Sequence, residues 1–145
     1  MMARQAFDPS RVPFRHGDDG KLDTATEALI RNVIGAAIEV HRALGPGYLE
    51  SVYENALAIE LNHQAISYER QKPFEVVYRN KTVGGGQLDF LVQHTLIVEL
   101  KAVESLTDLF TAQTLSYMKA TGRKVALLIN FNVPLLKQGI RRFIL

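Results

Sequence analysis

Three charged residues near the middle of the chain have the types and spacing of a catalytic site: Asp89, Glu99 and Lys101, within QLDFLVQHTLIVELKAVE. The apolar runs around them predict two neighbouring strands joined by a tight turn at Gln93-His94. Because side chains alternate along a strand, Glu99 and Lys101 are predicted to share one face. Asp89 is then expected opposite Glu99 or one step from it, near enough for both carboxylates to bind one ion.

This pattern favours a site for a hard divalent cation. Two carboxylates on neighbouring strands repel each other unless a cation or a shared proton lies between them. The ammonium of Lys101 can hold or help deprotonate an attacking water, and it can screen a phosphate. A structural interpretation stays open, because Glu-x-Lys in a strand is often a solvent-facing ion pair.

Two helices are predicted to precede these strands. Apolar residues recur at helical spacing over residues 22–44, with Asp23 or Thr24 as N-cap and Glu27 in the capping-box position. Gly45-Pro46-Gly47 then ends the helix, since proline cannot continue it. A second helix follows, and its expected buried stripe is Leu49, Val52, Tyr53, Ala56, Leu57 and Leu61.

The remaining elements are mostly strands. Alternating and apolar segments predict four strands, at 66–69, 74–78, 87–92 and 96–101, and a further apolar strand at 125–130. A third helix is predicted over 106–121, closed by Gly122, and short segments at 135–139 and 143–145 end the chain. The order ααββββαβαβ predicts an α/β fold.

Length and composition set the limits of this fold. With 145 residues, 47% of them hydrophobic, the chain is expected to form one domain over residues 22–145. Residues 1–21 contain Pro, Gly and mixed charges without a period, and are predicted to be a flexible arm. There is no cysteine, which excludes disulfides, zinc-thiolate sites and a cysteine nucleophile. No apolar run approaches the roughly 20 residues of a membrane span, so a cytoplasmic protein is expected.

Basic residues concentrate toward the end of the chain. Residues 105–145 hold six Lys/Arg against one Asp/Glu. These side chains can contact phosphates, although solvated surface charge is the commoner role of such residues. The six are Lys119, Arg123, Lys124, Lys137, Arg141 and Arg142.

With Asp89 followed by Glu99-x-Lys101, the sequence resembles the PD-(D/E)xK nuclease superfamily. More narrowly, it is similar to the GxxExxR proteins through IGAAIEVHRALGPGYLESVYENALAIEL, YERQKPFEVVY, LDFLV, IVELKAVE and AQTLSYMKATGRKVALLINF. The resemblance implies a restriction-endonuclease-like central mixed sheet flanked by helices. It also implies a nuclease that uses Mg²⁺ or Mn²⁺ and acts on nucleic acid. DNA is favoured over RNA only because members of the family usually act on DNA.

The resemblance extends the metal site. The family's helical glutamate corresponds to Glu50, which would complete a metal shell with Asp89, Glu99 and the Leu100 carbonyl. Glu54, one helical turn later, is a rival ligand. A purely structural role for Glu50 is also open, because an acid in the first turn of a helix is favoured by the helix dipole.

Further residues are assigned to substrate by the same resemblance. Gln113 and Tyr117 match the Q-x-x-x-Y element of exonuclease-like members, and Lys119 is the basic residue of the same helix. Without the resemblance, Gln113 would be interpreted as a packing-edge residue and Tyr117 as core. The seventh position of the G-x-x-E-x-x-R motif is an arginine in the group but Tyr53 in this chain. If that arginine binds phosphate, this chain either lacks the contact or makes it with another basic residue.

The leading hypothesis is therefore a metal-dependent nuclease in which Lys101 positions the attacking water. One alternative is a non-catalytic module on the same fold that binds nucleic acid or protein. Another is a homo-oligomeric scaffold whose C-terminal strand, 143–145, pairs between subunits. The histidines lack metal-ligand spacing, and His41 falls on an apolar helix face, where a satisfied core histidine is expected.

Overall fold

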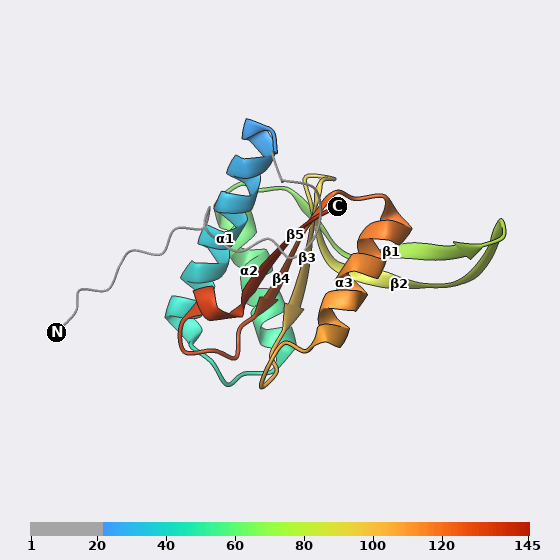
Figure 1. The fold of residues 1–145 in the computed structure, drawn as a ribbon. Helices are drawn as coiled ribbons and strands as arrows, with labels where there is room; N and C mark the ends of the chain where they lie inside the picture. Colours follow the sequence, from blue (N-terminus) through green and yellow to red (C-terminus); the bar gives the residue numbers. More distant parts are fainter. Residues whose placement is uncertain (1–21) are drawn as a thin grey trace.

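The computed structural model describes residues 22–145, so the predicted N-terminal arm, residues 1–21, lies outside the described residues. Two helices come first, followed by a five-stranded sheet with one inserted helix (Figure 1). The elements are α1 (Thr24–Leu44), α2 (Glu50–His63), β1 (Tyr68–Tyr78), β2 (Lys81–Val92), β3 (Leu96–Lys101), α3 (Asp108–Thr121), β4 (Val125–Asn130), the 3-10 turn η2 (Leu136–Gly139) and β5 (Ile140–Ile144). None of these helices is long and apolar enough to cross a membrane.

The sheet is mixed and has the order β1-β2-β3-β4-β5. Only β3 and β4 are parallel, and α3 makes the crossover between them. The helices α1 and α2 pack on one face, whereas α3 packs on the other (Figure 1). This arrangement confirms the predicted α/β fold with a restriction-endonuclease-like central sheet flanked by helices.

One detail of the strand prediction is wrong. The segments 66–69 and 74–78 were expected to be separate strands, but both lie in or beside the single strand β1. The reason is the partner strand: β2 begins at Lys81, well before the predicted 87, and pairs with β1 from Tyr68 to Tyr78, with a gap at Gln71. The apparent break around the polar residues 70–73 corresponds to a local irregularity, because Gln71 has a positive φ of 49°.

Helix ends follow the sequence in part. Asp23 is the N-cap of α1, and its Oδ1 accepts a hydrogen bond of 2.6 Å from Thr26 N. Gly122 ends α3 with a left-handed φ of 69°, as predicted. The capping box with Glu27 is wrong, because the Glu27 carboxylate instead forms an ion pair with the buried Arg142 of β5.

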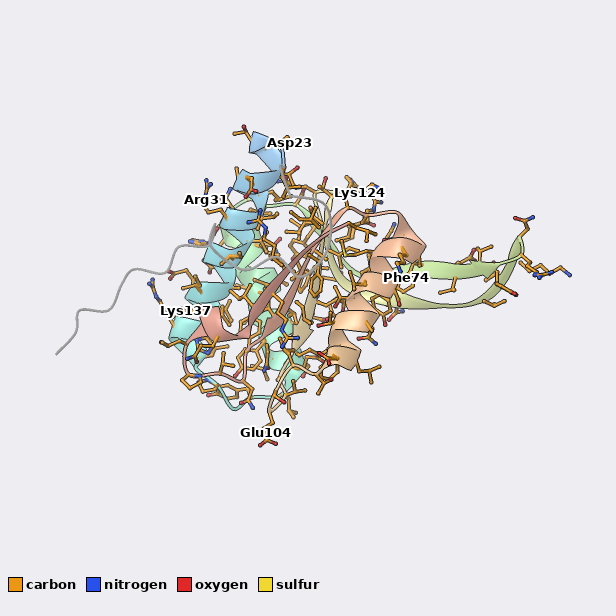
Figure 2. All side chains as sticks on the ribbon, viewed as in Figure 1. Asp23, Arg31, Phe74, Glu104, Lys124 and Lys137 are labelled. Carbon is orange, nitrogen blue, oxygen red and sulfur yellow. The ribbon has the colours of Figure 1, made fainter. Side chains whose placement is uncertain are left out.

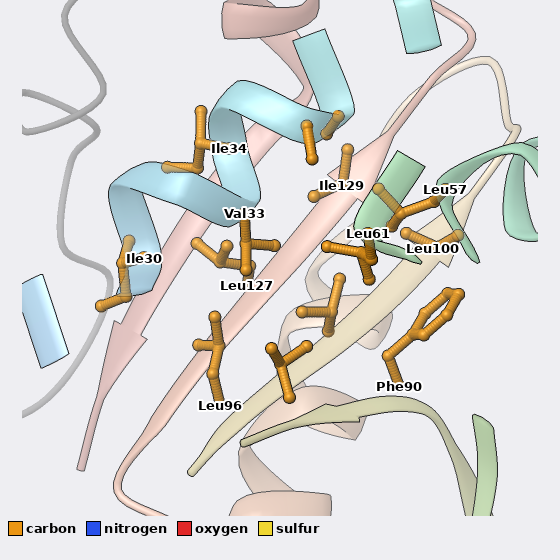
Figure 3. Packing of buried hydrophobic residues seen from close by; sticks show 14 of the residues in the cluster. Ile30, Val33, Ile34, Leu57, Leu61, Phe90, Leu96, Leu100, Leu127 and Ile129 are labelled. Carbon is orange, nitrogen blue, oxygen red and sulfur yellow. The ribbon is translucent and has the colours of Figure 1, made fainter. Parts of the chain in front are cut away.

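The main core holds β3 rigidly from one side. Leu96, Val98 and Leu100 of β3 are fully buried against α1 and α2. Figure 3 shows Leu96 and Leu100 in this core. Each such side chain contributes about 1.5–3 kcal/mol on burial. Since neighbouring side chains alternate, Glu99 and Lys101 point to the opposite face, the one that carries α3.

The hairpin of β1 and β2 projects beyond the body of the domain, past α3 (Figure 1). We call residues 73–86 of this hairpin the β-arm. Its tip is the turn Arg79-Asn80, where both residues have positive φ, as a two-residue hairpin turn requires. Several large apolar side chains are exposed on the arm: Val76, Val77, Tyr78 and Val83.

Candidate metal centre

The candidate centre lies where β2 and β3 separate. The turn between them has three residues, 93–95, rather than the predicted two, and Thr95 N donates to Val92 O at 3.0 Å. The register that follows places Asp89 directly opposite Glu99. Regular pairing stops one residue earlier, at Phe90 and Val98.

One residue beyond the last regular backbone pair, the Asp89 side chain accepts a hydrogen bond from the backbone of β3. Its Oδ2 accepts from Leu100 N at 2.8 Å, while Glu99 Oε1 accepts from Asp89 N at 3.3 Å. The N–H and C=O of one strand residue point to the same side, so the Leu100 carbonyl also points toward β2. The two carboxylates and this carbonyl therefore gather at one point of the sheet.

The protonation of Glu99 reflects this crowding. Glu99 is only 5% exposed. Burial, followed by the neighbouring charge of Asp89, raises the pKa of Glu99 to about 9. Without a cation, the pair therefore holds a proton at neutral pH. A buried set of oxygen donors that cannot be fully ionised on its own fits a hard divalent cation such as Mg²⁺ or Mn²⁺.

Lys101 lies on the same face as Glu99, beside α3. Its Nζ is 4.9 Å from the centroid of the Phe110 ring, a cation–π contact that orients the ammonium. Burial and the charge of Asp89 raise the pKa of both Glu99 and Glu50, and the positive charge of Lys101 offsets part of this rise. The ammonium is thus electrostatically coupled to both carboxylates.

Glu50 is the first residue of α2 and remains largely exposed. Partial burial, followed by the charge of Asp89, raises its pKa, so Glu50 lies within electrostatic range of the carboxylate pair. Its rival Glu54 is occupied by an ion pair of 2.6 Å with Arg70. Over residues 22–145, no group of three or more His, Asp or Glu side chains is arranged as a metal-ligand set. The structure therefore brings Asp89 and Glu99 together and leaves Glu50 nearby.

Gln71 is a neighbour of the centre that sequence reasoning missed. It stands in β1 across from Asp89, at a gap in the pairing of β1 with β2. Its Nε2 donates to Glu54 Oε1 at 2.5 Å and to Asp89 Oδ1 at 3.3 Å. A glutamine in a strand gives no signal in the sequence, because its role depends on the unusual positive φ that aims it at two carboxylates.

The Q-x-x-x-Y element lies on α3, on the side of the sheet to which Glu99 points. Burial, followed by the charges of Glu99 and Asp89, raises the pKa of Tyr117. The Tyr117 ring also packs on Phe74 of the β-arm, with centroids 4.7 Å apart. Gln113 is half-buried one turn earlier on the same face, while Lys119 is exposed. Tyr117 is thus the member of this set that the structure couples to the carboxylates.

The basic C-terminal residues divide into two groups. Arg142 is buried against Glu27, so the predicted phosphate contact is wrong for this residue. Arg141 donates to Thr111 Oγ1 and to Leu106 O, which ties β5 to α3 and the segment before it. Arg123 donates to His94 O of the turn between β2 and β3. Lys119, Lys124 and Lys137 are exposed.

The interpretation of His41 as a core histidine is confirmed. Its ring is buried, and Nε2 is 2.8 Å from Val133 O. The hydrogen bond satisfies this nitrogen within the fold. His41 therefore needs no ligand to explain its position on the apolar side of α1.

Comparison with known proteins identifies the family. The model of the PD-(D/E)XK nuclease superfamily matches residues 27–143, from the first turn of α1 into β5. Searches of curated proteins and of solved structures gave no match. The family match covers the opposed carboxylates, Lys101 and all three helices, and on this basis the chain belongs to the PD-(D/E)xK nuclease superfamily.

Proposed function

We propose that this protein is a divalent-metal-dependent nuclease of the GxxExxR group that hydrolyses phosphodiester bonds in DNA. The observation that carries the proposal is the opposition of Asp89 and Glu99 where β2 and β3 separate, with Lys101 on the same face as Glu99. The nuclease superfamily match over residues 27–143 supports the same chemistry.

The metal ligands proposed are Asp89, Glu99, the Leu100 carbonyl and Glu50. Mg²⁺ or Mn²⁺ at this position would polarise the scissile phosphate and lower the pKa of a bound water. We favour Glu50 over Glu54, because the ion pair with Arg70 already occupies Glu54. The pKa of Glu50 is raised in part by the charge of Asp89, which supports its inclusion.

Other side chains act on the substrate directly. The Lys101 ammonium, held over the Phe110 ring, can hold the attacking water and screen the charge of a phosphate oxygen. The Tyr117 hydroxyl can donate to a phosphate oxygen beside the carboxylates, and Gln113 can do so one turn earlier. Lys119 would contact the backbone further along the strand.

A non-catalytic nucleic-acid- or protein-binding module is the second candidate function. A specific observation favours it: between Leu22 and the C-terminus, no three potential metal-ligating side chains converge. In this alternative, Asp89 and Glu99 share a proton, and the ion pair of Glu54 with Arg70 is structural. The protein would then bind its partner without cleaving it.

Calorimetric titration of Mn²⁺ distinguishes the two functions. Wild type is expected to bind Mn²⁺ and to cleave DNA, whereas Asp89→Asn is expected to lose both, because the variant removes one charge and keeps the shape. Asp108→Asn is the matched control, since Asp108 is an exposed aspartate at the start of α3. Binding of Mn²⁺ without cleavage would favour the module. Absence of Mn²⁺ binding to wild type would refute the proposed centre.

A further inference from the structure

A groove runs between the β-arm and the exposed side of α3. Its volume is about 510 Å³. The wall formed by the arm is mostly apolar but includes the acid Glu75, and the wall formed by α3 ends in a lysine. Its main lining residues are Phe74, Glu75, Val76, Val77, Tyr117 and Lys119. Figure 2 shows Phe74 between α3 and the base of the arm.

One residue, Tyr117, links the groove to the candidate metal centre. Tyr117 lines the groove and is also coupled to the charges of Glu99 and Asp89. A smaller hollow of about 180 Å³ shares Phe74 with the groove and is lined in addition by Lys72 and Arg123. A chain-like ligand lying in this channel would therefore contact Tyr117, which is within electrostatic range of the carboxylates.

The charge around the groove is complementary to a polyanion. The groove and the smaller hollow are lined by three basic residues, Lys72, Lys119 and Arg123, and by one acid, Glu75. Lys72 is paired with Glu69 at 2.9 Å, so Lys119 and Arg123 are the main sources of positive charge. Positive charge gathered along one groove is the electrostatic pattern of a nucleic-acid channel.

We propose that a single unpaired nucleic-acid strand lies in this groove, with its bases against the apolar arm and its phosphates toward Lys119, and runs past Tyr117 to the metal centre. The proposal rests on the proposed nuclease function and names its substrate class. A groove of this volume has the size of a site for a small organic ligand, about 300–1,000 Å³, which suits a nucleotide or two rather than a duplex.

The chemistry of the lining also favours a single strand. Phe74, Tyr117 and the valines of the arm can pack against the faces of bases. In a duplex these faces are stacked on one another, so the apolar wall would find no partner there. Lys119 supplies a phosphate contact that does not depend on base sequence.

Fluorescence anisotropy in EDTA tests the proposal without metal or catalysis. The probes are a labelled oligo-dT strand of about ten nucleotides, within the range of known single-strand sites, and its duplex with oligo-dA. The variants are Lys119→Gln and, as matched control, Lys137→Gln, an exposed lysine of η2 on the opposite side of the domain (Figure 2). Phe74→Leu tests contact with the bases, with thermal unfolding as its check on folding.

Wild type is expected to bind the single strand more tightly than the duplex. Lys119→Gln should weaken binding and lower the salt slope by about one, whereas Lys137→Gln should leave both unchanged. Equal or tighter binding of the duplex, equal effects of the two lysine variants, or no binding of either probe would overturn the proposal. Because no metal is present, failure of Mn²⁺ binding or of cleavage would leave this result intact and would count against the proposed function alone.

Discussion

Replacing Glu99 by glutamine should change how the stability of the metal-free protein depends on pH. The pKa of Glu99 is about 9 in the folded protein and near 4.5 in the unfolded chain. Between these values the folded state holds a proton that the unfolded state has lost. The contribution of Glu99 to the free energy of unfolding is therefore largest below pH 4.5 and falls as the pH rises toward 9, by up to about 1.4 kcal/mol per pH unit.

Glu99→Gln removes this loss, because glutamine resembles the protonated carboxyl group and does not titrate. Wild type and variant should have similar stability near pH 5, and the variant should be more stable by up to about 3 kcal/mol near pH 7.5. Urea unfolding in EDTA across this range measures the difference. Glu104→Gln is the control, because Glu104 projects into solvent (Figure 2).

Excess Mn²⁺ should reverse the order of the two proteins. Near pH 7.5 wild type should gain about 4.1 kcal/mol at a thousandfold excess over the dissociation constant, which exceeds its deficit of up to about 3 kcal/mol, and Glu99→Gln should gain much less. If the unfolding free energies of wild type and variant stay parallel from pH 5 to about 7.5 in EDTA, Glu99 does not hold the extra proton and the reasoning fails.

Two further substitutions test the scaffold by urea unfolding. Gly85→Ala should lower the free energy of unfolding by about 1–3 kcal/mol, because its Cβ would lie 2.4 Å from Phe74 O. Gly84→Ala is the control: its Cβ would meet nothing within 4 Å, so the substitution should be neutral or stabilising. Equal effects of the two substitutions would show that Gly85 is not required for the close packing of β1 on β2. Glu27→Gln should cost about 3–5 kcal/mol, because it removes the carboxylate that pairs with the buried guanidinium of Arg142, and a loss below about 1 kcal/mol would show that this ion pair is weak.

The sequence predicted the elements whose signals are local. Apolar periodicity located the helices, Asp23 and Gly122 marked two helix ends, and the alternation of strand residues placed Glu99 and Lys101 on one face. The opposition of Asp89 and Glu99 also followed from local pairing, because only a short turn separates their strands.

The parts that the sequence did not predict depend on contacts distant along the chain. Glu27 was assigned to a local cap, but its partner Arg142 lies at the other end of the chain and is visible only in the folded structure. The unbroken β1 likewise depends on its pairing with β2. The left-handed backbone of Gln71, which directs its amide to the carboxylates, has no counterpart in residue type or spacing.

The β2–β3 hairpin has a consequence for the order of folding. Its closure needs only a three-residue turn, and hairpins of this kind form within about 1–10 μs. The Asp89 and Glu99 carboxylates therefore meet early, whereas Glu50 joins them only when the distant helix α2 docks on the sheet. Folding should consequently be slower at neutral pH than near pH 4.5, since Glu99 is ionised in the unfolded chain at neutral pH and must approach Asp89 before any other part of the centre exists.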